Sequence, residues 1–407
     1  MRAPTETFDA ERLLDPADGV ARYLRAVRVG PGGVEHVPLA AAFGRVLARD
    51  GTADADVPAD RRSTMDGFAV RSSDGAAPRR IAATVRMGAA PPVLAAGEAV
   101  RIPTGGVLPA AADAVVPIED AGERDGTLHV DAAPDAGAYF TPRGDDMRAG
   151  DVVLRAGRRI GAPELSVLAT LGLAVVPVYR RPRVAVVSTG DELIDVDAVP
   201  GTGQVRDSNR WAIAGGLAAF GCDVVHVGRA RDEIASVRER IVEGLAVADA
   251  VVLTGGSSVG ARDHVPAAID GLGAPGVIVH GLRVKPGKPT ALGAVGTQPV
   301  IGLPGNPASA LTILDAVLGD VFAALAGTDR AARATIAGVA GAAFTGRDGW
   351  TWYVPSEVRA DGVRPLPLRS AHTSLLARAD GYVVVGPERS RIEPGEPVTL
   401  VRYGAVR

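Results

Sequence analysis

The sequence predicts a multidomain α/β protein whose central domain is a mostly parallel sheet with flanking helices. Two observations carry this prediction. The length of 407 residues exceeds what one hydrophobic core usually supports. Between residues 183 and 327, short β-branched strands also alternate with helical segments. Such a series places helices on both faces of a parallel sheet, so we expect an α/β domain at 183–327 with further domains on either side.

The composition argues against several classes of protein. Hydrophobic residues make up 47% of the chain and the formal net charge is −3, so no positive surplus is present to hold a nucleic acid. Residues 1–11 are polar rather than signal-like, and no apolar run reaches membrane-spanning length. We therefore expect a cytoplasmic protein that binds neither nucleic acid nor membrane. The single cysteine, Cys222, excludes an internal disulfide and is predicted to be a core residue.

The region before residue 183 is predicted to be a helical N-terminal domain that carries a β-rich insertion. The helical domain is expected in two segments, 1–50 and 150–182, with its first helix at 9–27. Between these segments, residues 51–149 combine Gly and Pro with short runs such as Ala114–Ile118. That pattern is typical of short strands separated by turns.

The C-terminal segment, residues 328–407, is predicted to be a compact all-β domain. Apolar residues alternate with polar ones at 351–354, 382–385 and 397–401, and Gly and Pro bound these runs. Alternation of this kind is typical of strands with one buried face.

Polar motifs follow three of the predicted strands in the central domain. They are Ser188–Glu192, Thr254–Gly260 and Pro304–Pro307. The carboxyl ends of parallel strands meet at one edge of a sheet, where ligands bind in α/β folds. Asn306 before Pro307 predicts a helix start that directs free backbone N–H groups at an anion. No P-loop sequence is present, so the chain is not predicted to be a P-loop nucleotide hydrolase.

Only two of the 44 basic residues are lysine, and they stand close together as Lys285 and Lys288. The other basic residues are all arginine, so arginine is used in this chain wherever only a positive charge is needed. The two retained lysines therefore indicate positions where an arginine side chain would not function. An ammonium group is a compact point charge, whereas a guanidinium is a wide planar fork. We therefore predict a cramped site for a small tetrahedral anion, with chance proximity as the alternative. Gly287, between two prolines, predicts a tight turn.

The motifs together resemble those of the molybdopterin molybdenumtransferase family, which includes the bacterial MoeA proteins and the E domain of gephyrin. The blocks that carry the resemblance run along nearly the whole chain: Ser63–Arg71, Arg101–Pro109, Ala112–Pro117 with Glu119, Ser188–Leu193, Asp207–Asn209, Thr254–Asp263, Lys285–Pro289 and Leu303–Pro307. The resemblance implies a C-terminal domain that is a β-barrel. It also implies a homodimer whose active site lies between the α/β domain of one subunit and the inserted domain of the other.

The resemblance further implies the reaction, which inserts molybdate into adenylylated molybdopterin, releases AMP and uses Mg²⁺ or another divalent ion. The residues that it assigns to catalysis are Asp66, Asp146, Glu192, Asp232, Asp263, Lys285 and Lys288, with Asp263 also as metal ligand. The residues that it assigns to substrate binding are Thr104, Thr254, Gly255, Gly256, Ser257, Pro304, Asn306, Ser309 and Ser370. The implied protein partners are the adenylyltransferase and molybdoenzyme apoproteins.

Several of these residues have a plainer structural explanation. Asp66 suits an Asx-turn, whereas Asp232 and Asp263 suit helix caps. Glu192 is the stronger candidate for a functional carboxylate, because glutamate is not a usual helix cap.

Two other functions of the protein also stay open. One is the related adenylyltransferase, which needs neither the Met-Asp-Gly region nor the C-terminal domain, and the other is a gephyrin-like scaffold without turnover, in which degraded site residues are expected.

Three positions depart from the family pattern. Thr141 stands where arginine is expected, Asp145 stands where glutamate is expected, and Arg61–Arg62 replaces an Asp-Asn pair. All three lie in the inserted region. We expect them to alter contacts there and to leave the central set of residues intact.

Overall fold

The chain folds into two compact units in the computed structural model, which describes residues 13–255, 264–367 and 369–403. Unit 1 comprises Met1–Ala48, Gly157–Gly161 and Val175–Arg407. Unit 2 comprises Arg49–Ala156 and Ala162–Ala174.

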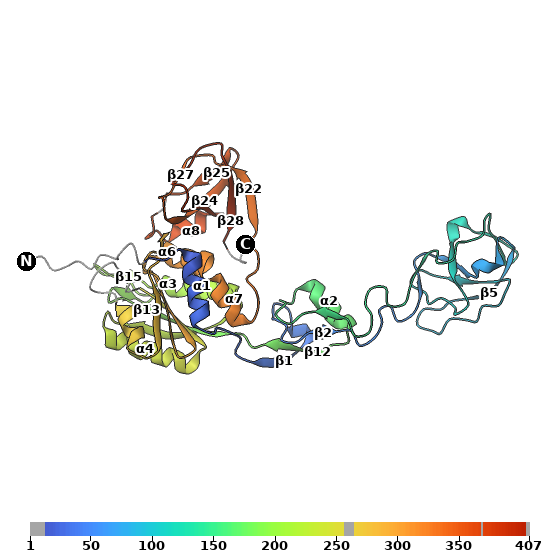
Figure 1. Ribbon diagram of the computed structural model, residues 1–407, viewed down its shortest axis with the longest axis horizontal. Coiled ribbons are helices and arrows are strands. Elements are labelled where there is room, and N and C mark those ends of the chain that lie inside the picture. The colour runs from blue at the N-terminus through green and yellow to red at the C-terminus, as the bar shows by residue number, and fades with distance from the viewer. Residues whose placement is uncertain (1–12, 256–263, 368, 404–407) are drawn as a thin grey trace, which may run out of the picture. The chain divides into compact units, whose positions relative to one another are not determined.

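Unit 1 is organised around a six-stranded sheet (Figure 1). The strand order is β16 (Asp223–Ala230), β13 (Arg183–Thr189), β17 (Ala250–Thr254), β21 (Gln298–Leu303), β20 (Ala291–Val295) and β18 (Pro275–His280). The first four strands pair in parallel, and β20 and β18 are antiparallel to their neighbours. The five predicted strands are confirmed. The sheet is mostly parallel, as predicted, and the antiparallel strand β20 makes it a mixed one.

Strand β20 is the element that makes the sheet mixed, and the sequence did not predict it. Val295 of β20 pairs with Gln298 of β21, and Gly296 between them has a φ of +58°. So short a turn joins only antiparallel neighbours. The β20 sequence contains one β-branched residue, Val295, so it lacks the composition typical of a strand.

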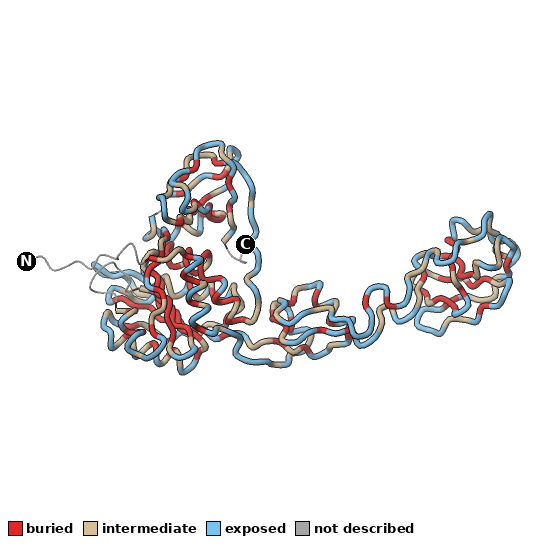
Figure 2. The backbone as a smooth tube through the Cα atoms, in the orientation of Figure 1, coloured by how far each residue is buried: buried red, intermediate tan, exposed pale blue. Residues whose placement is uncertain are grey.

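Helices cover both faces of this sheet. One face packs against α1 (Pro16–Ala26), α3 (Asn209–Ala219), α6 (Pro307–Thr312) and α7 (Gly319–Ala326), and the other against α4 (Ile234–Val247) and α5 (His264–Asp270). Along β13, Val184 and Val186 belong to the first core, and Ala185 and Val187 to the second. Successive strand residues point to opposite faces, which is why the central strands are buried along their length in Figure 2.

The helix starts differ from the predicted ones in two places. Helix α1 begins at Pro16 rather than at residue 9, and the Asp15 carboxylate accepts the Ala17 N–H at 3.0 Å. Helix α4 begins at Ile234, after Glu233, rather than at Asp232. Within the described residues, no single helix has the length and apolarity to cross a membrane; the pair Pro307–Val317 and Gly319–Ala326 reaches both only when its halves, bent by 56°, are joined.

The last part of unit 1 is a second sheet, which also takes in the lysine segment. Its order is β19 (Val284–Lys285), β24 (Thr351–Arg359), β26 (Gly381–Val385), β28 (Pro397–Arg402) and β22 (Thr335–Val339), with β25 (Gly362–Pro365) beside β24. Phe344, Val383 and Leu400 lie in its core. The smaller elements of unit 1 are the pairs β1 (Val34–Pro38) with β12 (Val175–Tyr179), β14 (Leu193–Ile194) with β15 (Val205–Arg206) and β23 (Phe344–Thr345) with β27 (Arg391–Ile392), and helix α8 (Ser374–Arg378).

Unit 2 contains the β-rich region that the sequence predicts. Its main sheet has the order β7 (Ala114–Pro117), β4 (Gly67–Val70), β6 (Glu98–Ile102), β5 (Arg79–Thr84), β9 (Thr127–His129) and β8 (Gly122–Arg124). The other elements are the pairs β2 (Gly51–Thr52) with β11 (Val152–Leu154) and β3 (Arg62–Ser63) with β10 (Phe140–Thr141), and helix α2 (Ala162–Thr170). Alternate residues of β4 fill the two sides of this sheet.

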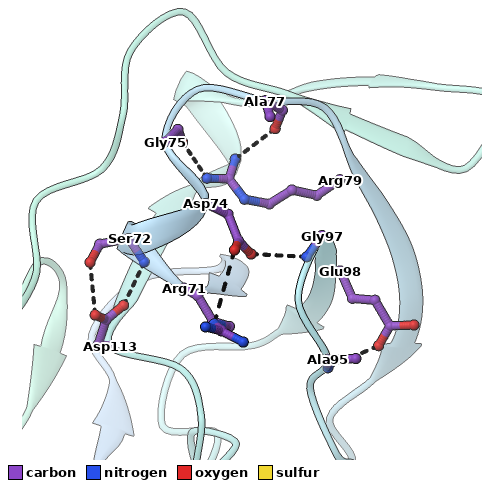
Figure 3. A network of polar contacts seen from close by, with 10 residues as sticks. All are labelled: Arg71, Ser72, Asp74, Gly75, Ala77, Arg79, Ala95, Gly97, Glu98 and Asp113. Carbon is purple, nitrogen blue, oxygen red and sulfur yellow. Dashed lines mark hydrogen bonds and ion pairs between the residues drawn. The ribbon is translucent and has the colours of Figure 1, made fainter.

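A polar network fixes the turn that follows β4 (Figure 3). The Asp113 carboxylate accepts the Ser72 N–H at 2.6 Å and the Ser72 hydroxyl at 2.7 Å. The Asp74 carboxylate accepts the Gly97 N–H at 3.0 Å. The guanidinium of Arg79 is fully buried and donates to the carbonyls of Gly75 and Ala77, and this burial lowers its pKa. These groups hold the turn rather than face a ligand.

Candidate functional site

Three parallel strands of unit 1 end together, and the described residues that follow them lie at one edge of the sheet. Ser188 of β13 pairs with Thr254 of β17, and Thr254 pairs with Leu303 of β21. The sequence predicted this convergence. We call the segments after these three strands, together with the start of α3, the strand-end edge.

Asn209, the first residue of α3, ties two of the strand ends together. Its Nδ2 donates to Thr254 Oγ1 at 2.9 Å and to the Gly305 carbonyl at 2.7 Å. Its Oδ1 is buried and has no hydrogen-bond partner among the described residues. Sequence reasoning assigned no role to Asn209, although it ends the Asp207–Asn209 block that carries part of the family resemblance.

The backbones at the strand-end edge approach too closely for side chains. Gly255 has a φ of +114°, and a Cβ there would lie 2.1 Å from the Thr189 carbonyl oxygen. A Cβ on Gly305 would lie 3.3 Å from Gly255 Cα. Beneath this contact, the hydroxyls of Ser188 and Thr189 are buried without a partner in the described part of the chain. Buried polar groups normally find a partner, so these hydroxyls are candidates for contact with a ligand.

Carboxylates lie at the outer rim of this edge. The Asp232 N–H donates to Asp191 Oδ1 at 3.3 Å, which brings the segments after β16 and β13 together. The Glu192 carboxylate folds against Gly190, where a Cβ would lie 2.6 Å from its Oε2. Glu192 is exposed and Asp232 is half-buried. Asp232 is not the cap of α4, because Glu233 occupies that position, so its plainer explanation is wrong.

The carboxylates at the rim do not form a complete metal site by themselves. Across the described residues, no group of three His, Cys, Asp or Glu side chains is arranged to hold a metal. Mg²⁺ often uses only one or two protein carboxylates and completes its shell with phosphate oxygens and water. Asp191 and Asp232 fit that mode. The predicted ligand Asp263 lies outside the described residues, as do Gly256 and Ser257.

The lysine segment forms the tight turn that the sequence predicts. Gly287 has a φ of +112°, and a Cβ there would lie 2.2 Å from a side-chain carbon of Ile313. Lys285 Nζ lies 4.2 Å from the centroid of the Trp352 ring, which is a cation–π contact. Lys285 is exposed and Lys288 is half-buried. The cramped surroundings expected for both lysines are therefore absent around Lys285 in the single chain.

Asn306 and Ser370 are brought together from opposite parts of unit 1. Asn306 Nδ2 donates to Ser370 Oγ at 3.2 Å, and the Ala308 N–H donates to the Ser370 carbonyl at 3.1 Å. Asn306 precedes Pro307 at the start of α6, as predicted. The expected free N–H groups are only partly available, because Ser370 accepts one of them. Pro304 and Ser309, also predicted contacts, are buried beside this helix start.

The predicted site residues of unit 2 form one pair and one separate carboxylate. Asp66 Oδ1 accepts the Thr104 N–H at 2.7 Å and the Thr104 hydroxyl at 3.1 Å. Asp66 therefore does not form the simple Asx-turn that was its plainer explanation. Asp146 is exposed, and its N–H donates to the Val57 carbonyl at 3.0 Å.

Cys222 is a core residue, as predicted. It is buried among the apolar side chains on the α3 face of the central sheet. Burial raises the pKa of its thiol to about 12. The thiol stays protonated at neutral pH, so Cys222 is not an activated nucleophile.

Taken together, the mixed α/β sheet and the glycine turns at its strand ends define a protein with a candidate ligand-binding edge at the carboxyl ends of its parallel strands. Three family profiles match the chain. They are the MoeA N-terminal region (domains I and II) at residues 14–172, the probable molybdopterin-binding domain at 185–324 and the MoeA C-terminal region (domain IV) at 337–402.

Individual relatives agree with these profiles. A molybdopterin molybdenumtransferase of Haemophilus influenzae is 31% identical over 381 residues, which cover 91% of this chain and 94% of the relative. One of Bacillus subtilis is 35% identical over 290 residues, 68% and 67% of the two chains. Two solved structures of the MoeA protein of Pyrococcus horikoshii match 96% of this chain and at least 99% of their own, with TM-scores of 0.80 and 0.84 at 28% and 22% identity. The chain belongs to the molybdopterin molybdenumtransferase family.

Proposed function

We propose that this chain inserts molybdenum from molybdate into adenylylated molybdopterin, with release of AMP, as a cytoplasmic step of molybdenum cofactor biosynthesis. The observation that carries the proposal is the strand-end edge, where buried hydroxyls without partners and a glycine-only backbone contact lie within a domain that matches a molybdopterin-binding profile. The substrate is a large anion that needs neutral donors for its body and positive charge for its phosphates and for molybdate.

The roles of individual residues follow from their chemistry. We assign Thr254, Gly255, Gly256, Ser257 and Pro304 to binding of the substrate body, since they follow the strand ends. Lys285 and Lys288 neutralise molybdate or the phosphate that it displaces, because an ammonium group is a strong donor to such oxyanions. Asn306, Ser309 and Ser370 complete the anion contacts.

Carboxylates serve the metal ion and orient the reacting groups. We assign Glu192, Asp232 and Asp263 to the edge of the central sheet, with Asp263 as a direct ligand of Mg²⁺ or another divalent ion. Such an ion would supply charge neutralisation at the phosphate linkage. Asp66, together with Thr104 and Asp146, acts from unit 2.

We further propose that the active protein is a homodimer in which Asp66 and Asp146 of one copy act with the lysines of the other. The family resemblance supports this proposal and also the division into four domains, with a C-terminal β-barrel. Transfer of substrate from the adenylyltransferase and delivery to molybdoenzyme apoproteins would follow. Sedimentation that finds a fully active monomer would contradict the dimer.

The two other functions have less support. An adenylyltransferase needs only the central domain, whereas three profiles cover this chain from residue 14 to residue 402. A scaffold without turnover would not need to keep Lys285, Lys288 and the rim carboxylates. The curated relatives are named for the transferase reaction.

The proposal is tested with purified protein, adenylylated molybdopterin, molybdate and Mg²⁺. We expect release of AMP together with formation of a cofactor that restores activity to an apo-molybdoenzyme. Consumption of ATP with adenylylation of molybdopterin would instead identify the adenylyltransferase. Failure to release AMP with any divalent ion would refute the transferase assignment.

A further inference from the structure

Unit 2 contains a cleft of about 760 Å³ that no residue assigned to the transfer reaction lines. Four arginines line it, Arg61, Arg62, Arg86 and Arg143, whereas Asp60 is the single lining carboxylate. We call this feature the arginine cleft. It is built from four separate segments of the chain, and it includes the Arg61–Arg62 pair that departs from the family pattern.

Within the described residues, the first two arginines form no ion pair with a carboxylate, although the charge of Arg61 acts on Asp113. Arg61 donates to the carbonyls of Ala112 at 2.7 Å and Ala110 at 2.8 Å, and Arg62 donates to the Gly105 carbonyl at 2.8 Å. A carbonyl satisfies a donor and fixes its position without neutralising the guanidinium. The two side chains are therefore held in place as cations before any ligand arrives.

The other two arginines differ in whether the guanidinium group already has a partner. Arg143 Nε donates to Asp56 Oδ2 at 2.6 Å in an ion pair that neutralises one charge. Arg86 is exposed, and its guanidinium has no hydrogen bond or ion pair anywhere in the described residues. The cleft consequently has a surplus of positive charge, and Arg86 is the cation that is free to close on a ligand.

Apolar groups form the rest of the wall. Met87, with 60% of its surface exposed, lies in the lining beside Pro91, Val107 and Leu108. Guanidinium groups match the oxygens of a phosphate in a planar fork, and apolar walls suit a flat, uncharged body. We propose that the arginine cleft binds a phosphate monoester that carries an apolar or aromatic body.

AMP is also the product of the proposed transfer reaction, so binding at this cleft is separated from binding at the strand-end edge by the location of the ligand, and no turnover is needed. The probe is AMP, titrated into the full-length protein by calorimetry, with adenosine, inorganic phosphate and molybdate as separate arms. Hydrogen–deuterium exchange then locates the ligand. We expect AMP to protect the amides of residues 86–90 and 105–108, whereas adenosine, phosphate and molybdate do so only weakly. Equal protection by any of these three would overturn the assignment to phosphate monoesters.

Charge-removing variants test the arginines themselves. Arg86→Gln and Arg62→Gln should each weaken AMP binding at this cleft by about tenfold, the size of one charge-assisted hydrogen bond. Arg124→Gln is the matched control, because Arg124 is an exposed arginine of unit 2 outside the cleft, and it should leave both affinity and protection unchanged. The Arg86 variant removes no contact that holds the fold. Unchanged AMP protection in both cleft variants would refute the proposal.

Discussion

The strand-end edge of unit 1 and the arginine cleft of unit 2 offer two different surfaces to anions. The edge is built from backbone and from neutral buried groups such as Thr189, Thr254 and Asn209, with the lysines as its predicted charges. The cleft is lined by four guanidinium groups, two from the half-buried Arg61 and Arg62 and two from the exposed Arg86 and Arg143. The difference teaches that ligand binding at the edge depends on close backbone packing. Ligand binding at the cleft depends on positive charge, part of which, on Arg86, is free to move toward the ligand.

The largest effect is expected where backbone fit is tightest. Gly255→Ala places a Cβ 2.1 Å from the Thr189 carbonyl oxygen at a φ of +114°. We expect a loss of about 2–4 kcal/mol in the free energy of unfolding, measured in urea, and loss of AMP release. Gly296→Ala is the control, because Gly296 also has a positive φ, +58°, but nothing within 4 Å. Equal losses of unfolding free energy in the two variants would show that the close backbone approach at Gly255 is not what makes this glycine necessary.

The next effect tests whether compact charge matters at the edge. Lys285→Arg and Lys288→Arg keep the charge but widen the group, so each should lower the rate of AMP release by about 100-fold. Their melting temperatures should match that of the wild type. Arg283→Lys, in the same segment, should leave the rate within about twofold. Rates near wild type in both lysine variants would mean that the two lysines are not needed as lysines.

A smaller effect is expected from the side chain that joins two strand ends. Asn209→Ala removes the donors to Thr254 Oγ1 and to the Gly305 carbonyl, which should lower the free energy of unfolding by about 2 kcal/mol. Ser208→Ala is its control, because the Ser208 side chain makes no capping hydrogen bond to α3. Stability of the Asn209 variant equal to that of the Ser208 variant would show that this link is unimportant.

The smallest effect concerns pH and Asp113, which holds the turn after β4 through Ser72. Burial alone would raise the pKa of Asp113, but the hydrogen bonds from Ser72 and the charge of Arg61 outweigh it, and the pKa is lowered. A carboxylate with a lowered pKa stabilises the folded state above its unfolded pKa, and this stabilisation is lost as pH falls through the folded value. Between pH 6 and pH 3, the melting temperature of the wild type should therefore fall by about 2 °C more than that of Asp113→Asn. If the melting temperatures of the wild type and of Asp113→Asn fell equally with pH, the stabilising role of the Asp113 carboxylate would be contradicted.

The sequence predicted the position of the strand-end edge because each strand and the turn that follows it are marked by residues that are adjacent in the sequence. Strands rich in valine mark β13 and β17, and Gly190 and Gly255 directly follow them. The strand β20 escaped prediction because its residues are mostly alanine, leucine and glycine, and its pairing depends on a hairpin with β21. Tertiary pairing, not local preference, decides such an element.

The arginine cleft could not be predicted in the same way. Its four arginines come from three separate segments of a chain in which 44 residues are basic, so no spacing distinguishes them. Arg61 and Arg62 were noticeable only as departures from the family pattern. Similarly, Thr189 and Asn209 lay within recognised motifs, but only the burial of Thr189 Oγ1 and Asn209 Oδ1 without partners among the described residues makes them candidates for ligand contact.

The most direct test of the account measures AMP release from adenylylated molybdopterin with and without molybdate, in the wild type and in the Lys288→Arg variant. We expect fast release in the wild type only when molybdate is present, and a rate about 100-fold lower in the variant at the same molybdate concentration. Release that does not depend on molybdate, or that is equal in the two proteins, would contradict the proposal that the strand-end edge and its lysines exchange AMP for molybdenum.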